Sequence, residues 1–111
     1  MGLKDEISQN SEEFKNLCKI HRVKYIFAFG SSISDDFNPE SSDIDLLIEI
    51  DDPDPIGRGE KLLSVWDLLE KFFKRKVDLL TESSIHNPYL RKSIDATKIL
   101  IYDGKGQKVF V

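Results

Sequence analysis

Residues 29–50 carry the pattern from which the architecture is inferred: Phe29-Gly30-Ser31-Ser32, and then Ser41-Ser42-Asp43-Ile44-Asp45-Leu46-Leu47-Ile48-Glu49-Ile50. This is typical of a strand end, a glycine–serine turn, a short connection and a second strand that opens with two carboxylates. Side chains alternate between the faces of a strand, so Asp43 and Asp45 share one face. The apolar residues that share the other face are Ile44, Leu46, Ile48 and Ile50. The pattern predicts two acids side by side on the open face of a sheet.

These residue types suit a site for a metal and a phosphate. Paired carboxylates on a rigid strand supply the hard oxygen ligands that divalent cations prefer. The turn at Gly30 and Ser31 offers backbone N–H groups and a hydroxyl, which suit a phosphate. Serine and aspartate at a strand start are also common turn residues. A purely structural role for Ser41, Ser42 and Asp43 therefore stays open at this point.

The composition predicts one soluble domain over residues 1–111. The chain is 40% hydrophobic and 32% charged, as in ordinary globular domains. No apolar run approaches the ~20 residues of a membrane span, and the N-terminus lacks a signal region. We therefore expect a cytoplasmic protein that does not contact a membrane. The net charge of −4 makes nucleic acid an unexpected partner, because phosphate contacts need clustered Lys and Arg.

Two amphipathic helices are expected, the first from Leu3 to about His21 and the second from Gly57 to about Lys74. The single cysteine, Cys18, lies on the first apolar stripe, and we interpret it as a core residue because no base is adjacent. His21 is interpreted as a C-terminal cation or a packed ring. Four cations gather at the end of the second helix: Lys71, Lys74, Arg75 and Lys76. They either offset the negative end of the helix dipole or form a basic rim for a phosphate chain.

Four short apolar runs predict the strands, namely Lys24–Phe29, Asp43–Ile50, Val77–Leu80 and Lys98–Tyr102. In the third run Asp78 alternates with its apolar neighbours, so a third acid can lie on the same face as the first two. Asn87 is expected to cap a helix with Pro88 at its first position, running to about Ala96. The apolar end at 109–111 either folds back as an edge strand, meets a partner or stays loose.

The order of these elements predicts an α/β (α+β) fold, with a small mixed sheet and helices packed on one face. The other face would then be a site or an interface.

With its glycine–serine turn, its paired acids and its third acid taken together, the chain resembles the DNA polymerase β-like nucleotidyltransferase superfamily, and within it the minimal nucleotidyltransferases. The resemblance spans roughly residues 24–102. The motifs that carry it are Gly30-Ser31, Ser42-Asp43-Ile44-Asp45-Leu46, Val77-Asp78-Leu79, Asn87-Pro88-Tyr89-Leu90-Arg91 and Ile99-Leu100-Ile101-Tyr102.

The resemblance implies Mg²⁺-dependent transfer of a nucleoside monophosphate from a nucleoside triphosphate. Asp43 and Asp45 match the acids that bind one or two Mg²⁺ ions in the family, and Asp78 matches the third metal ligand and base. The implied nucleotide-binding residues are Gly30, Ser31 and Ser42.

The turn departs from the family pattern, which continues with a small residue, an arginine and a glycine. This chain has Ile33, Ser34 and Asp35 there, followed by Asp36. A cation for the phosphates is missing, and a like charge at close range costs on the order of a few kcal/mol. The loop either turns these acids outward or weakens the site. The cations that could substitute are Arg58, Lys61, Arg75 and Arg91.

Two functions compete, and the leading one is an enzyme. By resemblance it transfers a nucleoside monophosphate, AMP in the first place, to a hydroxyl of a partner HEPN-domain toxin and acts as its antitoxin. The alternative is a weak or inactive protein of this fold that neutralises its partner by binding, which Ser34 and Asp35 favour. A transferase acting on RNA or a small molecule is disfavoured by the acidic charge and short length. Self-association is left open.

Overall fold

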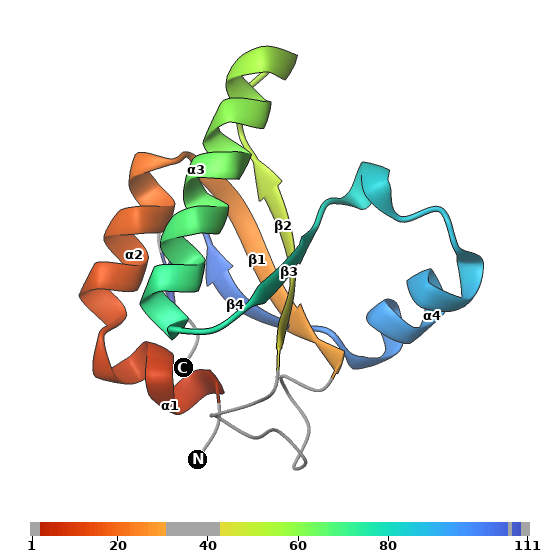
Figure 1. Ribbon diagram of the computed structural model, residues 1–111, viewed down its shortest axis with the longest axis horizontal. Helices are drawn as coiled ribbons and strands as arrows, with labels where there is room; N and C mark the ends of the chain where they lie inside the picture. Colours follow the sequence, from red (N-terminus) through yellow and green to blue (C-terminus); the bar gives the residue numbers. More distant parts are fainter. Residues whose placement is uncertain (1–2, 31–42, 107, 110–111) are drawn as a thin grey trace.

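The computed structural model describes residues 3–30, 43–106 and 108–109, apart from the side chains of Lys4 and Lys108. A mixed five-stranded sheet has the strand order β3-β2-β1-β4-β5, with helices on both sides (Figure 1). The strands are β1 (Val23–Phe29), β2 (Ile44–Ile50), β3 (Val77–Leu80), β4 (Ile99–Asp103) and β5 (Lys108–Val109). The helices are α1 (Leu3–Gln9), α2 (Ser11–Ile20), α3 (Pro55–Phe73) and α4 (Pro88–Thr97), with a 3-10 helix, η2 (Glu82–Ser84). The predicted α/β (α+β) fold with a mixed sheet is confirmed.

The centre of the sheet combines antiparallel and parallel pairing. β1 is antiparallel to both β2 and β4, whereas β2 and β3 run parallel. A parallel pair needs a long crossover, which α3 provides. α3 begins at Pro55, two residues earlier than predicted, because the Asp54 carboxylate accepts hydrogen bonds from the N–H groups of Ile56 and Gly57 at 3.3 and 3.2 Å.

The main core lies between one sheet face and the helices α1, α2 and α3. The four alternating apolar residues of β2 are at most 5% exposed: Ile44, Leu46, Ile48 and Ile50. Cys18 is fully buried in this core, and burial raises the pKa of its thiol, so the interpretation as a core residue is confirmed. His21 is a packed ring whose nitrogens bond the Leu17 carbonyl at 2.8 Å and the Ser64 hydroxyl at 2.9 Å.

The second face of the sheet is partly covered by α4, which lies apart from the other helices (Figure 1). Ile94 of α4 is fully buried against Phe29 and Leu47. The expectation that the helices pack on one face therefore describes α1, α2 and α3, and α4 must be placed on the other. The physical reason is that Phe29 and Leu47 present apolar surface there, which the apolar side of α4 removes from water.

Two local features also differ from the sequence expectations, and a third decides between alternatives that the sequence left open. The first predicted helix is divided into α1 and α2 because Asn10 leaves the helical conformation (φ −136°, ψ 43°). Val109 pairs with Tyr102 as part of an edge strand, the first of the three alternatives for this end. The short helix η2 was not predicted. None of the helices in the described part of the chain has the length and apolar content needed to cross a membrane.

Two side chains of α3 hold the outer edge of β3. The Trp66 indole N–H donates to the Val77 carbonyl at 2.8 Å, and the Val77 N–H donates to the Glu70 carboxylate at 3.0 Å. On the inner side of this strand, the Ile44 N–H donates to the Lys76 carbonyl at 3.1 Å. Because the backbone groups of Val77 point away from β2, they would otherwise lack partners at a sheet edge. This two-point clamp fixes the residue directly before Asp78.

The clamp predicts different stabilities for two substitutions of Glu70. Glu70→Ala leaves the buried Val77 N–H without its acceptor and should lower the free energy of unfolding by about 1–3 kcal/mol. Glu70→Gln keeps an oxygen acceptor and should recover most of that loss. Urea denaturation followed by the fluorescence of Trp66, the single tryptophan, measures both. Equal stability of the alanine variant and the wild type would contradict the clamp.

Candidate active site

Two carboxylates from neighbouring strands form the centre of the candidate site. Asp45 of β2 lies opposite Asp78 of β3 in the parallel register, and the two side chains hydrogen-bond. Asp43, exposed just before β2, adds a third negative charge. Burial, then the charge and hydrogen bond of Asp78, then the charge of Asp43 raise the pKa of Asp45 from its ordinary 3.8 to about 6. The structure thus brings Asp45 and Asp78 together, and Asp43 acts on Asp45 through its charge.

The turn residue Gly30 lies directly against this acid pair. Its φ of +66° is in the left-handed region, and a Cβ added there would be 2.7 Å from the Asp45 Oδ2 atom. Only glycine meets both demands without displacing the carboxylate. The turn at Gly30 and the acid pair therefore lie side by side. Ser31 and Ser42, like Ser34 and Asp35, lie outside the described residues, and their roles remain predictions.

An open pocket of about 470 Å³ extends from the acids. Its lining residues are Phe29, Gly30, Asp45, Trp66, Asp78, Leu79, Leu80, Leu90 and Ser93. The volume falls within the range of small-molecule sites. The lining combines the carboxylates of Asp45 and Asp78 with apolar side chains such as Leu80 and Leu90, which suits a ligand with a charged group and a flat apolar group.

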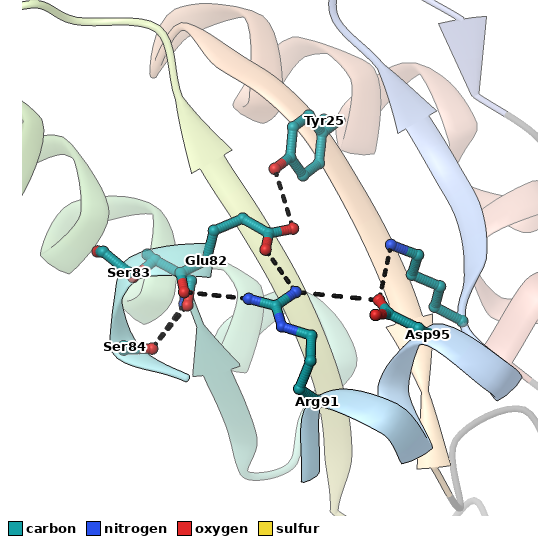
Figure 2. A network of polar contacts seen from close by, with 8 residues as sticks. Tyr25, Glu82, Ser83, Ser84, Arg91 and Asp95 are labelled. Carbon is teal, nitrogen blue, oxygen red and sulfur yellow. Dashed lines mark hydrogen bonds and ion pairs between the residues drawn. The ribbon is translucent and has the colours of Figure 1, made fainter. Parts of the chain in front are cut away.

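A polar network holds α4 in place (Figure 2). Leu90 and Ser93 of this helix line the pocket. Arg91 pairs with the Glu82 carboxylate at 2.5 Å and donates to the Glu82 carbonyl at 3.3 Å. The Tyr25 hydroxyl donates to the same carboxylate at 3.4 Å, and burial, followed by the charge of Glu82, raises the pKa of Tyr25 to about 12. Leu90 and Ser93, next to Arg91 on α4, are thereby held at the pocket.

The four cations named as substitutes for the missing loop arginine all have other partners. Arg58 donates to the Asp52 carbonyl at 3.0 Å, and Lys61 pairs with the Asp52 carboxylate at 2.6 Å. Arg75 pairs with Glu6 at 2.8 Å, and Arg91 pairs with Glu82. These contacts give all four a structural role.

Lys76 is the cation that does approach the acids, with its Nζ atom 3.7 Å from Asp78 Oδ1. It belongs to the basic end of α3, where Lys71 pairs with Asp67 at 2.9 Å and Lys74 is a left-handed C-cap. The expected basic rim is thus reduced to Lys76 among the described residues. Its spacing, two residues before Asp78, was the available sequence signal, since such residues share a strand face.

The donor set fits Mg²⁺. No three His, Cys, Asp or Glu side chains within residues 3–30, 43–106 and 108–109 gather closely enough to form a metal site of their own. Mg²⁺ does not require such a cage, because it binds through one or two carboxylates together with substrate phosphates and water. Asp45 and Asp78 supply two carboxylates, and a divalent cation would relieve the repulsion that, after burial, raises the pKa of Asp45.

Comparison with known proteins identifies the family. A family model described as a nucleotidyltransferase domain matches residues 9–101. The chain belongs to the nucleotidyltransferase domain family. The matched residues of this nucleotidyltransferase include Gly30, Asp43, Asp45 and Asp78.

Individual relatives agree with this assignment. The chain is 38% identical over 97 residues to "Putative protein adenylyltransferase MJ1379" of Methanocaldococcus jannaschii, covering 86% of this chain and 95% of the relative. A solved structure of a putative minimal nucleotidyltransferase has a TM-score of 0.65 at 23% identity, covering 89% of this chain and 95% of that one. A solved complex of tri-AMPylated HEPN toxin with MNT antitoxin from Shewanella oneidensis has a TM-score of 0.51 at 20% identity, covering 89% and 74%. The minimal nucleotidyltransferase fold is confirmed.

Gly30 lies against Asp45, whereas Gly59 has open space around it, so replacing each with alanine should change the free energy of unfolding in opposite directions. Gly30→Ala places a side chain in a left-handed conformation and against the carboxylate, and should lower the free energy of unfolding by about 1–2 kcal/mol. Gly59→Ala, on α3 with nothing within 4 Å of the added Cβ, should raise it by about 0.5–1 kcal/mol. Urea denaturation of both variants tests the difference. A stable Gly30→Ala would mean that this turn is not constrained as described.

The repulsion between the acids predicts that Asp45→Asn stabilises the metal-free protein. Between about pH 4 and 6 the folded chain retains a proton that the unfolded chain has released. The wild type therefore loses stability as the pH rises through this range. In EDTA, Asp45→Asn should raise the Tm above about pH 7, and the gain should shrink near pH 4. Asp67→Asn, on the exposed side of α3, is the control and should give no gain. A gain independent of pH would exclude relief of charge as its cause.

Proposed function

We propose that this nucleotidyltransferase transfers AMP from ATP to a hydroxyl group of a partner protein. The observation that carries the proposal is the pairing of Asp45 with Asp78 beside Gly30, at a pocket of small-molecule size. The relative named as a protein adenylyltransferase, matched over 95% of its length, supports AMP as the transferred group and a protein as the acceptor.

Each acid has a role that follows from its place. Asp43 and Asp45, with Asp78 beside them, would hold Mg²⁺. When bound, Mg²⁺ supplies neutralisation of the triphosphate charge and orientation of the attacking and leaving oxygens. Asp78 accepts the proton of the acceptor hydroxyl. The hydroxyl oxygen then bonds to the α-phosphorus of ATP. The bond between the α-phosphorus and the oxygen that bridges it to the β-phosphorus breaks, and pyrophosphate leaves.

The remaining groups position the substrates. Gly30 allows the backbone to approach the triphosphate closely, and Lys76 adds a positive charge beside Asp78. The apolar side chains of Leu80 and Leu90 offer a surface for the base. Phosphoryl transfer asks mainly for positioning and charge neutralisation, so this small set is sufficient.

We further propose that the acceptor is a HEPN-domain toxin in the cytoplasm and that the chain is its antitoxin. The fold similarity to an MNT antitoxin solved with a tri-AMPylated HEPN toxin supports this choice. At the start of α4, next to the pocket, Tyr89 is 84% exposed and Leu90 is 40% exposed. These apolar groups provide a docking surface for an acceptor protein close to the acids.

A second function has its own support. The cation beside the acids is Lys76, which is exposed and 3.7 Å from Asp78, a weaker arrangement than a buried arginine. A chain with little transfer activity could still neutralise the toxin by covering it. This alternative predicts that neutralisation does not depend on the acids.

Transfer can be tested with labelled ATP, Mg²⁺ and a purified HEPN protein. The toxin should gain label from α-phosphate-labelled ATP and none from γ-labelled ATP. Asp45→Asn and Asp78→Asn should each lower labelling by at least about 100-fold, because each removes a charged ligand or the base. Asp67→Asn is the control and should label as the wild type does. Label from γ-labelled ATP would indicate a kinase and overturn the proposal.

The same variants separate the two functions in cells that express the toxin. If Asp45→Asn and Asp78→Asn fail to restore growth while still binding the toxin, neutralisation requires transfer. If both restore growth as well as the wild type, the binding function is the correct one.

A further inference from the structure

A second, basic pocket of about 410 Å³ lies near the start of β1. Its lining residues are Lys19, Arg22, Val23, Lys24, Asp51, Tyr102, Gly104 and Lys105. Four of these are cations and one is a carboxylate, which leaves a formal charge of +3 around one concave surface. The whole chain has a net charge of −4, so this concentration of positive charge is local.

This basic pocket is separate from the candidate active site. It lies where β1 begins at Val23, β2 ends before Asp51 and β4 ends before Gly104. Gly30 follows the other end of β1, where Asp45 pairs with Phe29. A strand of seven residues spans roughly 20 Å, so one small ligand cannot reach both places.

The cations of the basic pocket make no ion pair with any other residue that the structure describes. Across the described residues, Lys19, Arg22, Lys24 and Lys105 make no ion pair within 4.0 Å. Other cations of this chain are paired, as Lys61 is with Asp52 at 2.6 Å. Lys61 thus pairs with Asp52, the carboxylate whose pKa the charge of Arg22 also lowers. The positive charge of the pocket is therefore available to an external anion.

Arg22 occupies a position where glycine would be easier to accommodate. Its φ is +54°, and it follows the C-cap His21 of α2, a position where helices often end with a left-handed glycine. Its backbone is held from both sides, since its N–H donates to the Lys19 carbonyl at 3.1 Å and its carbonyl accepts from the Asp51 N–H at 2.8 Å. An arginine in this conformation keeps a guanidinium at the pocket, and such outliers motivate a functional hypothesis.

We propose that the basic pocket binds a small anion that carries two or more phosphate groups. A guanidinium can contact phosphate oxygens with two parallel hydrogen bonds, and the three lysines add point charges around it. The pocket is concave and also has apolar side chains, Val23 and Tyr102. This shape suits a molecule of nucleotide size better than a flat acidic protein surface.

The test is an NMR titration of the ¹⁵N-labelled protein with inorganic tripolyphosphate, in EDTA so that no metal draws phosphate to the acids. The amides of Val23, Lys24, Asp51 and Lys105 should shift and saturate below millimolar ligand. Arg22→Gly should weaken binding about tenfold and yet raise the Tm, because glycine suits the left-handed turn. If Arg22 had only a structural role, a substitution that raised the Tm would not weaken binding of tripolyphosphate. Lys92→Ala, which removes an exposed lysine of α4, should bind as the wild type does.

Three results would overturn the proposal: shifts confined to Gly30, Asp45 and Asp78, shifts spread without saturation over exposed lysines, or unchanged affinity in Arg22→Gly. Titration with ATP in the same buffer identifies the source of the phosphates. Shifts at the same amides would assign the pocket to nucleotides, and shifts with tripolyphosphate alone would assign it to inorganic polyphosphate. Because no metal or acceptor takes part, this result is independent of the proposed transfer activity.

Discussion

The parallel pairing of β2 with β3 is the constraint on which the site depends. It places Asp45 opposite Asp78 and at the same time buries the apolar residues that alternate with them. A slip of one residue would turn Asp78 into the core and Leu79 out to solvent, which is strongly unfavourable. The hydrophobic core therefore enforces the contact between two acids that would otherwise move apart. The clamp of Trp66 and Glu70 on Val77 closes the outer edge of the same strand.

The sheet thus holds two carboxylates close together although their charges repel. Asp45 is half-buried beside Asp78, and its raised pKa records the unfavourable charge. Such strain persists only where the surrounding structure holds it, and it is typical of functional sites. Gly30 adds a second constraint, since its lack of a side chain lets the turn approach the same carboxylate. The sheet and the turn thus hold Gly30 and the Asp45–Asp78 pair in one place.

Charge is divided between the two ends of the sheet. Asp45 and Asp78 lie at the end of β1, whereas the pocket at its start is surrounded by four cations that make no ion pair among the described residues. Many of the remaining charges are paired and hold helices in place, as Arg75 does with Glu6 and Arg91 with Glu82. The net charge of −4 does not reveal that negative and positive charges are concentrated at different ends of the sheet. Partners that respond to charge will therefore meet different surfaces at the two ends of β1.

Patterns local in the chain were sufficient to predict much of this protein. Alternation along single strands placed Asp45 and Asp78 on one face, and the pair Asn87-Pro88 marked the start of α4, because both effects act within a few residues. Contacts between distant segments could not be predicted in this way. The packing of Ile94 on Phe29 and Leu47 moved α4 to the second face, and ion pairs with Asp52, Glu6 and Glu82 engaged the cations expected at the phosphates. The basic pocket around Arg22 likewise arises from tertiary packing, which joins chain segments that no local spacing connects.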